Sequence, residues 1–147
     1  MINAQKIIIV SGPVIIENGA VLLNKHGDDD FWKFLGGKVE LKDIAGENVL
    51  EDTCKREVKE ENGFDIEIIY PLKPMMIKKP GSKNEFVVLI HFLARRKNKK
   101  NKLGSDISEF GKFNIKKLVK GAYKEKFAPN IIPILKNYLE LKRRKIL

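Results

Sequence analysis

The chain has 147 residues, of which 43% are hydrophobic and 33% charged, a balance typical of one globular domain with its own core. Lysine and arginine outnumber aspartate and glutamate by 29 to 19, and the resulting net charge of +10 favours anionic partners. No apolar run has the length of a membrane span, no secretory signal is evident, and the single cysteine, Cys54, forms no internal disulfide, so we expect a cytoplasmic protein without membrane contact.

The first segment is typical of two strands joined by a tight turn. Residues 6–16 are rich in isoleucine and valine, which favours a β-strand, but Ser11-Gly12-Pro13 interrupts them. Because proline donates no backbone hydrogen bond, we expect a strand edge or a bulge there. Asn18-Gly19 is typical of a two-residue hairpin turn. The chain is then expected to return as a second strand over residues 21–25 and to enter a polar loop over residues 26–30.

An acidic helix follows an aromatic segment and a pair of glycines. The aromatic segment is Phe31-Trp32-Lys33-Phe34, and the pair is Gly36-Gly37. Glycines lack a side chain and therefore allow another group to approach the backbone closely. The helix is predicted over residues 48–62, with Asn48 as its N-cap and Gly63 ending it.

One face of this helix carries three carboxylates, Glu57, Glu60 and Glu61, at positions i, i+3 and i+4. That spacing places like charges one above another, where they repel. Arg56 can pair with Glu60, and a divalent metal ion held by carboxylate oxygens would compensate the remaining charge. The same residues also fit a solvated, glutamate-rich helix face. The glycine pair upstream is what favours a metal site.

The second half of the chain alternates predicted strands with loops and closes on a helix. Strands flanked by a central and a terminal helix predict an α/β fold, with a mixed β-sheet inside an α/β/α sandwich and a single domain over residues 1–147. The segments of this half are a β region over residues 65–77, an apolar strand over 85–94, a basic run over 95–102, a short strand over 108–114, a short helix over 115–119 and a basic C-terminal helix over about 130–144.

The glycine pair and the acidic helix together resemble the signature of the Nudix hydrolases. That signature runs Gly, five residues, Glu, seven residues, Arg-Glu, an aliphatic residue, any residue, Glu-Glu, any residue, Gly and an aliphatic or similar residue. Residues 56–64, Arg-Glu-Val-Lys-Glu-Glu-Asn-Gly-Phe, meet its second half. In the first half Arg56 lies 19 positions after Gly37, where the signature has 14. We attribute the five extra residues to a lengthened loop over residues 41–45, with one residue more near the helix start.

The resemblance implies a role for each matching residue. Glu57, Glu60 and Glu61 would be ligands of Mg²⁺, with Mn²⁺ as an alternative, and the Gly37 carbonyl would be another ligand. Arg56 would orient these glutamates and limit their repulsion. Mg²⁺ held by these carboxylates would neutralise phosphate charge and make hydroxide available near neutral pH.

Other carboxylates are candidates for supporting roles and for the general base. Glu40 and Glu47 are expected behind the metal ligands, with Glu51 as a rival of Glu47. The base is either a glutamate of the signature, such as Glu60 or Glu57, or a carboxylate of a later loop. Glu109 is the first candidate among the later residues, and Asp106 is the second.

The implied substrate is a small nucleotide-type molecule, and the implied reaction is cleavage of a pyrophosphate bond in a nucleoside diphosphate derivative. Trp32 and Phe34 would stack on the base, although core packing is the commoner fate of such residues. Lys38 and the backbone at Gly36 would meet a phosphate. Pro80 lies about where relatives that cleave ADP-ribose carry a characteristic proline.

Two other functions stay open. The basic run and the basic tail could hold RNA, which would make the protein an RNA 5′-pyrophosphohydrolase whose activity falls with added salt. The lengthened loop leaves room for a non-catalytic module that binds a nucleotide or RNA. The oligomeric state is left open between a monomer and a homodimer.

Overall fold

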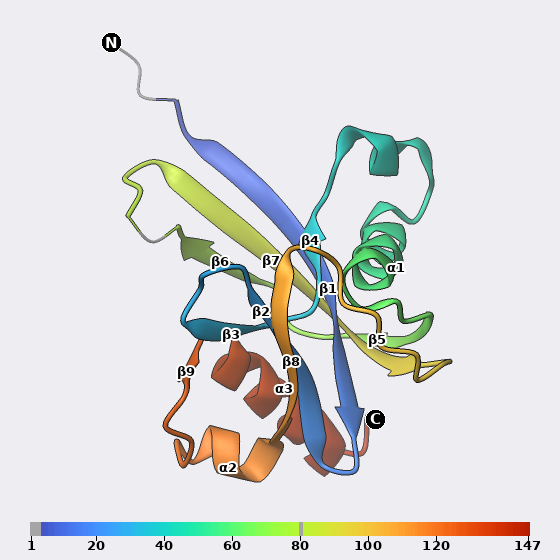
Figure 1. Ribbon diagram of the computed structural model, residues 1–147, viewed down its shortest axis with the longest axis vertical. Coiled ribbons are helices and arrows are strands. Elements are labelled where there is room, and N and C mark those ends of the chain that lie inside the picture. The colour runs from blue at the N-terminus through green and yellow to red at the C-terminus, as the bar shows by residue number, and fades with distance from the viewer. Residues whose placement is uncertain (1–3, 80) are drawn as a thin grey trace.

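The computed structural model describes residues 4–79 and 81–147, so Pro80 and the residue role expected for it lie outside the described part. The chain forms strands, a 3₁₀ helix and three α-helices (Figure 1). In chain order these are β1 Lys6–Glu17, β2 Ala20–His26, β3 Phe31–Phe34, β4 Gly37–Lys38, the 3₁₀ helix η1 Leu41–Ala45, α1 Val49–Asn62, β5 Ile66–Pro71, β6 Met75–Lys78, β7 Glu85–Arg96, β8 Ile107–Asn114, α2 Ile115–Val119, β9 Lys126–Phe127 and α3 Ile131–Arg143.

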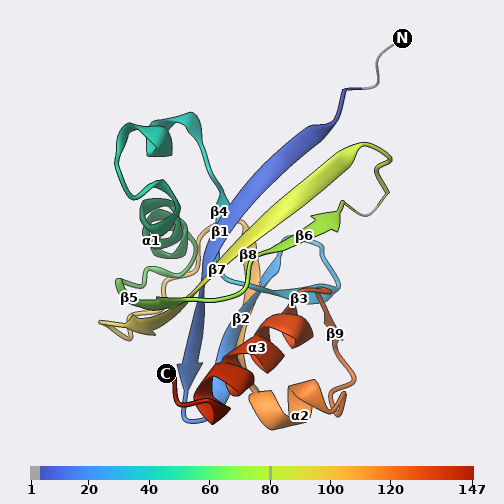
Figure 2. The ribbon, with the colours of Figure 1, turned by 180° about the vertical axis from the view of Figure 1, so that it is seen from behind.

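The sheet is mixed, as the sequence predicts. Its main path runs β5-β7-β1-β2-β3-β9, while β4 pairs with β1, β6 with β7 and β8 with β2. The pairs β1–β7 and β3–β9 are parallel, and the other pairs are antiparallel. Helix α1 lies on one side of the sheet and α3 on the other, so the predicted α/β/α sandwich is confirmed (Figure 2).

Successive side chains of the central strands alternate in direction, and they form a separate core on each side of the sheet. Val14 and Leu23 belong to the core under α3, whereas their neighbours Ile15 and Leu22 belong to the core under α1. Successive side chains of a strand point to opposite faces, so each strand serves both cores. Cys54 is fully buried in the α1 core, and burial raises the pKa of its thiol well above the ordinary value. Cys54 is therefore a packing residue.

The expected interruption of the first strand at Pro13 is wrong, because β1 runs unbroken from Lys6 to Glu17. On one side β1 pairs with β7 along residues 6–15. On the other side β4 pairs with residues 10 and 11, and β2 pairs with residues 16 and 17. Pro13 lies between these two short ladders, where its missing N–H costs no hydrogen bond to β4 or β2.

The turns and helix ends follow their local sequence. Asn18 and Gly19 have φ angles of 51° and 77°, which suits the two-residue hairpin predicted between β1 and β2. Gly63 has a φ of 75° and donates its N–H to the Lys59 carbonyl, so it ends α1 as expected. Among residues 4–79 and 81–147, no helix is long and apolar enough to cross a membrane.

Acid pH is expected to destabilise the fold through His91. This side chain is 3% exposed, its Nε2 lies 2.9 Å from Asn130 Nδ2, and burial lowers its pKa from 6.5 to about 4. Between about pH 6.5 and 4, the unfolded chain therefore binds a proton at His91 that the folded protein does not bind. Stability should fall by about 3 kcal/mol as the pH drops from about 6.5 to 4. Urea unfolding at pH 7 and pH 4 checks this prediction. Between these pH values the His91→Gln variant should lose less unfolding free energy than the wild type. An equal loss in both proteins would contradict it.

Candidate active site

The three carboxylates of α1 differ in their surroundings. Glu61 is buried, with its side chain 10% exposed, while the side chains of Glu57 and Glu60 are 13% and 54% exposed. Glu57 lies beside Gly37 and Glu61 accepts a hydrogen bond from Gly36, so both face the glycine pair, whereas Glu60 is exposed and shares Arg56 with Glu57. The helix therefore buries carboxylates as well as apolar residues. Carboxylates in such a place require compensation for lost solvation.

Glu61 is held by the main chain of the glycine pair. Its Oε1 accepts a hydrogen bond of 2.9 Å from the Gly36 N–H, and its Oε2 lies 3.2 Å from His26 Nε2. Burial raises the pKa of Glu61 to about 8, although the Gly36 hydrogen bond opposes this effect. Burial also lowers the pKa of His26, so the imidazole favours its neutral form beside this carboxylate. An additional cation would stabilise the ionised form of Glu61.

The glycine pair is required by close contacts on both sides. Gly36 has a φ of 128°, and a Cβ there would lie 2.4 Å from the Gly12 Cα. A Cβ at Gly37 would lie 2.3 Å from Glu57 Oε2. Gly36 therefore allows two strands to pack together, whereas Gly37 leaves room for a carboxylate. Of the two, Gly37 is the position at which a small change would act on the site alone.

Replacement of Gly37 by alanine is expected to lower activity without unfolding the protein. The new methyl group would displace the Glu57 carboxylate by about 1 Å, a misplacement that can cost on the order of a hundredfold in rate. Activity assays and urea unfolding measure the two effects. Gly12→Ala is the contrasting variant, because its Cβ would lie 2.0 Å from the Leu35 carbonyl oxygen and should destabilise the fold. Unchanged activity in Gly37→Ala would contradict the assignment.

Arg56 is the cation that holds this face of α1 together. Its Nη1 donates to Glu57 Oε1 at 3.0 Å and to Glu60 Oε2 at 3.2 Å. Its Nε and Nη2 donate to the two carboxylate oxygens of Asp43 at 2.8 and 2.7 Å, and Nη2 also reaches the Lys38 carbonyl at 3.2 Å. The guanidinium lowers the pKa of Asp43 well below its usual range. A bidentate pair of this kind fixes the orientation of the guanidinium plane.

Asp43 is a site residue that sequence reasoning missed. It lies six positions after Gly37, which is where the Nudix signature has its first glutamate. That spacing could have identified Asp43 from the sequence. Its side chain is one methylene shorter than the expected glutamate, however, and the prediction chose Glu47. Glu47 is exposed, and Glu40 is half exposed with its carboxylate 4.0 Å from Arg56. The five extra residues therefore follow Asp43, and residues 41–45 form the 3₁₀ helix η1 in place of a lengthened loop.

The aromatic residues expected to stack on a base are instead in the core. Trp32 and Phe34 are 7% and 8% exposed, and they pack edge to face against Phe113 and His91. The reason is that α3 covers the face of the sheet on which they lie, and its buried residues form one core with these two rings and with Phe113 of β8. Stacking by these two rings is therefore corrected to core packing. Lys38 is exposed beside the glycine pair.

The later carboxylates, Glu109 and Asp106, lie at β8 and just before it. Glu109 is on β8, with its Oε2 3.2 Å from Lys25 Nζ, and its side chain is 57% exposed. Asp106 acts on the candidate site through His26, which contacts Glu61: burial lowers the pKa of His26, and the Asp106 charge partly opposes this shift. The carbonyl of Asp106 also accepts a hydrogen bond of 2.9 Å from the Gly27 N–H. The identity of the base stays a prediction.

The donor set suits a hard divalent cation. Within residues 4–79 and 81–147, no three His, Cys, Asp or Glu side chains form a ready-made metal cage. Glu57 and Glu60 instead share Arg56, and Glu61 turns toward Gly36. Burial raises the pKa of both Glu57 and Glu61, so a bound cation would favour their ionised forms. Carboxylate and carbonyl oxygens at this place fit Mg²⁺ or Mn²⁺.

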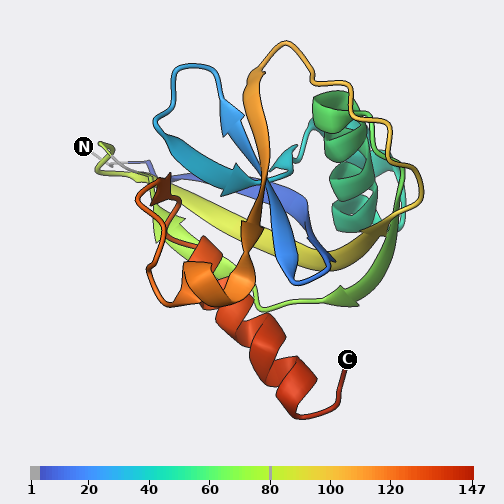
Figure 3. The same cartoon turned by 60° about the horizontal axis from the view of Figure 1, so that its bottom comes forward.

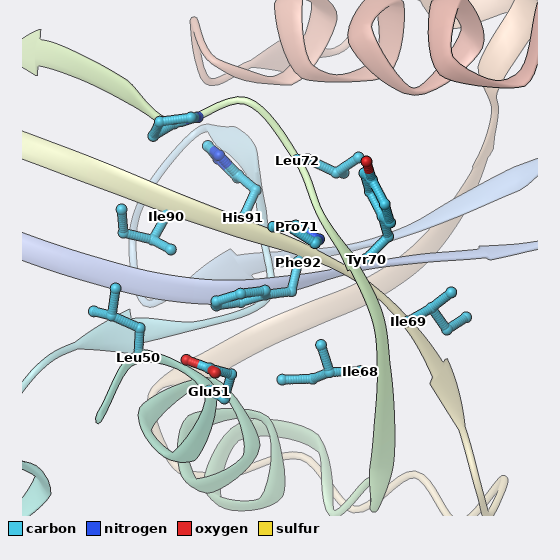
Figure 4. Close-up of a pocket in the computed structure, with 11 residues that line it drawn as sticks. Leu50, Glu51, Ile68, Ile69, Tyr70, Pro71, Leu72, Ile90, His91 and Phe92 are labelled. Atoms are coloured by element: carbon cyan, nitrogen blue, oxygen red, sulfur yellow. The ribbon is translucent and has the colours of Figure 1, made fainter. Parts of the chain in front are cut away.

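A hollow of about 480 Å³ lies elsewhere on the molecule (Figure 4). It is lined by apolar side chains of β5 and β7, including Ile68, Tyr70 and Phe92, and by Leu50 and Glu51 from the start of α1. Glu57, Glu60 and Glu61 are not part of its lining. Glu51, the rival of Glu47 in the sequence, therefore faces this hollow and not Arg56.

Comparison with known proteins identifies related chains. A family model described as NUDIX domain matches residues 7–138. The chain is 33% identical over 122 residues to mRNA-decapping enzyme subunit 2 of Saccharomyces cerevisiae, an alignment that covers 82% of this chain and 12% of the length of the yeast protein. The fold is similar to that of a MutT protein from Methanosarcina mazei, with a TM-score of 0.74, 20% identity and 96% of each chain covered. It is also similar to an ADP-ribose pyrophosphatase from Streptococcus suis, with a TM-score of 0.68, 20% identity and 92% of each chain covered.

Proposed function

The chain belongs to the Nudix family and is a Nudix-type hydrolase, and we propose that it is a Mg²⁺-dependent pyrophosphohydrolase acting on a nucleoside diphosphate derivative. The observation that carries this proposal is the row of three carboxylates on α1 beside the glycine pair, with Arg56 between them. Hydrolases of the family act on nucleotide-type substrates with divalent metals. The identity of the metal and of the substrate is the proposed part.

In this proposal each residue has a defined task, and Glu60 has two, as a metal ligand and as the base. Glu57, Glu60 and Glu61, with the Gly37 carbonyl, would hold Mg²⁺, which supplies charge neutralisation of the phosphates and a more acidic bound water. Arg56 is a positioning residue, because Asp43 orients its guanidinium and the guanidinium orients Glu57 and Glu60. Lys38 lies exposed beside the glycines and would contact a substrate phosphate.

The reaction needs a carboxylate that accepts a proton from water. The water oxygen attacks one phosphorus, the bridging P–O bond breaks, and the water proton passes to the carboxylate. Glu60 is the exposed member of the three glutamates, and its hydrogen bonds to Arg56 of 3.2 and 3.4 Å leave lone pairs free. We therefore assign the base to Glu60, with Glu109 as the alternative from β8.

A substrate panel tests the proposal. Purified protein with Mg²⁺ or Mn²⁺ should cleave at least one member of a set that includes nucleoside triphosphates, dinucleoside polyphosphates and ADP-ribose, with products identified by chromatography. Glu60→Gln should lose this activity, whereas Glu47→Gln, an equal change at an exposed residue near the start of α1, should keep it. A folded wild type that binds nucleotides but cleaves none would support the non-catalytic module instead.

A second candidate substrate, the 5′-terminal phosphates of RNA, is favoured by the segment between β7 and β8. This segment runs alongside α1 (Figure 3), with Lys97 N–H bonded to the Asp65 carbonyl, Lys102 N–H to Asn62 and Gly104 N–H to Glu61. A Cβ at Gly104 would lie 2.6 Å from the Glu60 carbonyl oxygen, so the contact is close. The segment is thereby fixed against the backbone of the last turn of α1, the turn that carries Glu60 and Glu61.

The lysines of this segment carry uncompensated charge. Four of them, at positions 97, 99, 100 and 102, are exposed and form no ion pair with any residue in the described part of the chain, whereas Arg95 and Arg96 pair with Glu67 and Glu17. A row of free cations on a segment bound to the helix that carries the carboxylates suits a phosphate chain that continues from the cleaved bond. The yeast relative is described as an mRNA-decapping enzyme, which supports the same substrate class.

Salt dependence distinguishes the two substrate classes. Hydrolysis of 5′-triphosphorylated RNA should fall steeply with added salt, and the triple change Lys99→Gln, Lys100→Gln and Lys102→Gln should reduce the slope of log KM against log salt by about 2. The same number of charges removed at Lys116, Lys120 and Lys124, on and after α2, is the control. Equal effects of the two triple variants would indicate net charge alone, without a binding surface.

A further inference from the structure

Two buried asparagines join the last turn of α1 to the central strand β2. Asn24 Nδ2 donates to Asn62 Oδ1 at 2.7 Å, and Asn62 Nδ2 donates to Asn24 Oδ1 at 2.9 Å. Both residues are fully buried. Each amide is therefore both donor and acceptor toward the other, in a planar pair across 38 positions of sequence. Such a pair tolerates little change in the angle between its two backbones.

The pair lies directly against the carboxylate that the main chain holds. Asn62 follows Glu61 in sequence, and the Asn24 amide lies near enough to the Glu61 side chain to oppose the rise of its pKa. On the outside of the same turn, the Asn62 carbonyl accepts from the Lys102 N–H at 3.0 Å. The last turn of α1 is thus held from the sheet by side-chain amides and from the surface by the backbone.

The start of the helix is tied to β1 by the Ser11 hydroxyl, which donates to the Leu50 carbonyl at 2.6 Å, whereas the middle of the helix meets the sheet through apolar contacts. Cys54 and Val58 are fully buried under α1 and pack against apolar side chains of the sheet. Apolar contacts of this kind allow a helix to rotate slightly about its axis, whereas paired amide hydrogen bonds do not. A rotation of about 10° moves a carboxylate lying about 5 Å from the helix axis by about 1 Å.

We propose that the Asn24–Asn62 pair fixes the rotation of α1 and thereby aims Glu57 and Glu61 at the glycine pair, so that both asparagines are positioning residues for hydrolysis. This inference rests on the proposed function. A satisfied buried amide pair gives little net stability over an apolar pair of similar shape, so its contribution is one of geometry. The two leucines that could replace it would fill the space but would not set the angle.

A double-mutant comparison separates positioning from stability. Asn24→Leu and Asn62→Leu alone each leave one buried amide without a partner, so both should lower the urea midpoint. The combined variant should recover a midpoint close to the wild type, yet its kcat should stay at least about tenfold below it. Its dissociation constant for Mn²⁺, measured by titration, should also rise at least about tenfold. Recovery of kcat and Mn²⁺ affinity together with the midpoint would overturn the inference.

Two further measurements keep the outcomes apart. Val14→Ala in the α3 core is a destabilised control, and its kcat should remain near the wild type while it is folded by circular dichroism. If the double leucine variant does not fold, the smaller Asn24→Ala, Asn62→Ala double variant takes its place with the same readouts. If the wild type is inactive on every substrate, the proposed function is wrong. The inference is then tested only by comparing the Mn²⁺ affinity of the double variant with that of the wild type. An active wild type with an unaffected double variant defeats the inference only.

Discussion

Replacement of Glu61 by glutamine should abolish hydrolysis and at the same time stabilise the metal-free protein. Glutamine keeps the acceptor that the Gly36 N–H uses, at 2.9 Å in the wild type, but removes the negative charge. Loss of an anionic ligand should lower kcat by at least about a hundredfold. Because Glu61 is buried and its pKa is raised to about 8, its charge opposes folding without a metal, and its removal should add about 1–3 kcal/mol of stability in EDTA.

A substitution that lowers activity while it raises stability identifies Glu61 as a functional residue. Activity is measured by nucleotide release with Mg²⁺, and stability by urea unfolding in EDTA. Glu47→Gln is the matched control, because Glu47 is exposed and the same chemical change should leave both quantities near the wild type. A Glu61→Gln protein that is active, or one that is less stable in EDTA, would show that this carboxylate is structural.

Replacement of Asp43 by asparagine should give the second large effect, a loss of both activity and stability. Asparagine has one acceptor oxygen and a donor NH₂, so it can accept only one of the two hydrogen bonds of 2.8 and 2.7 Å from the Arg56 guanidinium. Arg56 would then turn, and Glu57 and Glu60 would lose their common partner. We expect kcat to fall by about ten- to a hundredfold, since small misplacements of catalytic groups cost this much, and the urea midpoint to fall as well.

The comparison with Glu40 decides whether Asp43 is the residue that holds Arg56. Glu40 is half exposed and its Oε1 lies 4.0 Å from Arg56 Nη1, so Glu40→Gln should change kcat less than about twofold. Arg56 lowers the pKa of Asp43 below its usual range. The stabilisation of the fold by the Asp43–Arg56 pair is therefore present above about pH 4 and is lost as the pH falls further. Equal losses from Asp43→Asn and Glu40→Gln would contradict the assignment of Asp43.

Local sequence predicted those parts of the structure that depend on short-range rules. The spacing of the three glutamates placed them on one face of a helix, and Gly63 ended that helix with a positive φ. Asn18-Gly19 formed the turn for the same reason, because both residues tolerate positive φ. The extent of α1, the mixed sheet and the family were therefore available before any contact was known.

The tertiary structure alone decided which residues distant in sequence are in contact. The sequence by itself determined which residues carry charge and how they repeat along a helix or strand. It did not determine that Asp43, 13 positions before Arg56, holds the guanidinium, or that Gly36 and Asn24 reach Glu61 and Asn62 from 25 and 38 positions away. Trp32 and Phe34 likewise became core residues only when α3 closed over them. Pairing and burial of this kind depend on which segments meet in the folded chain, and periodicity within a segment does not contain that information.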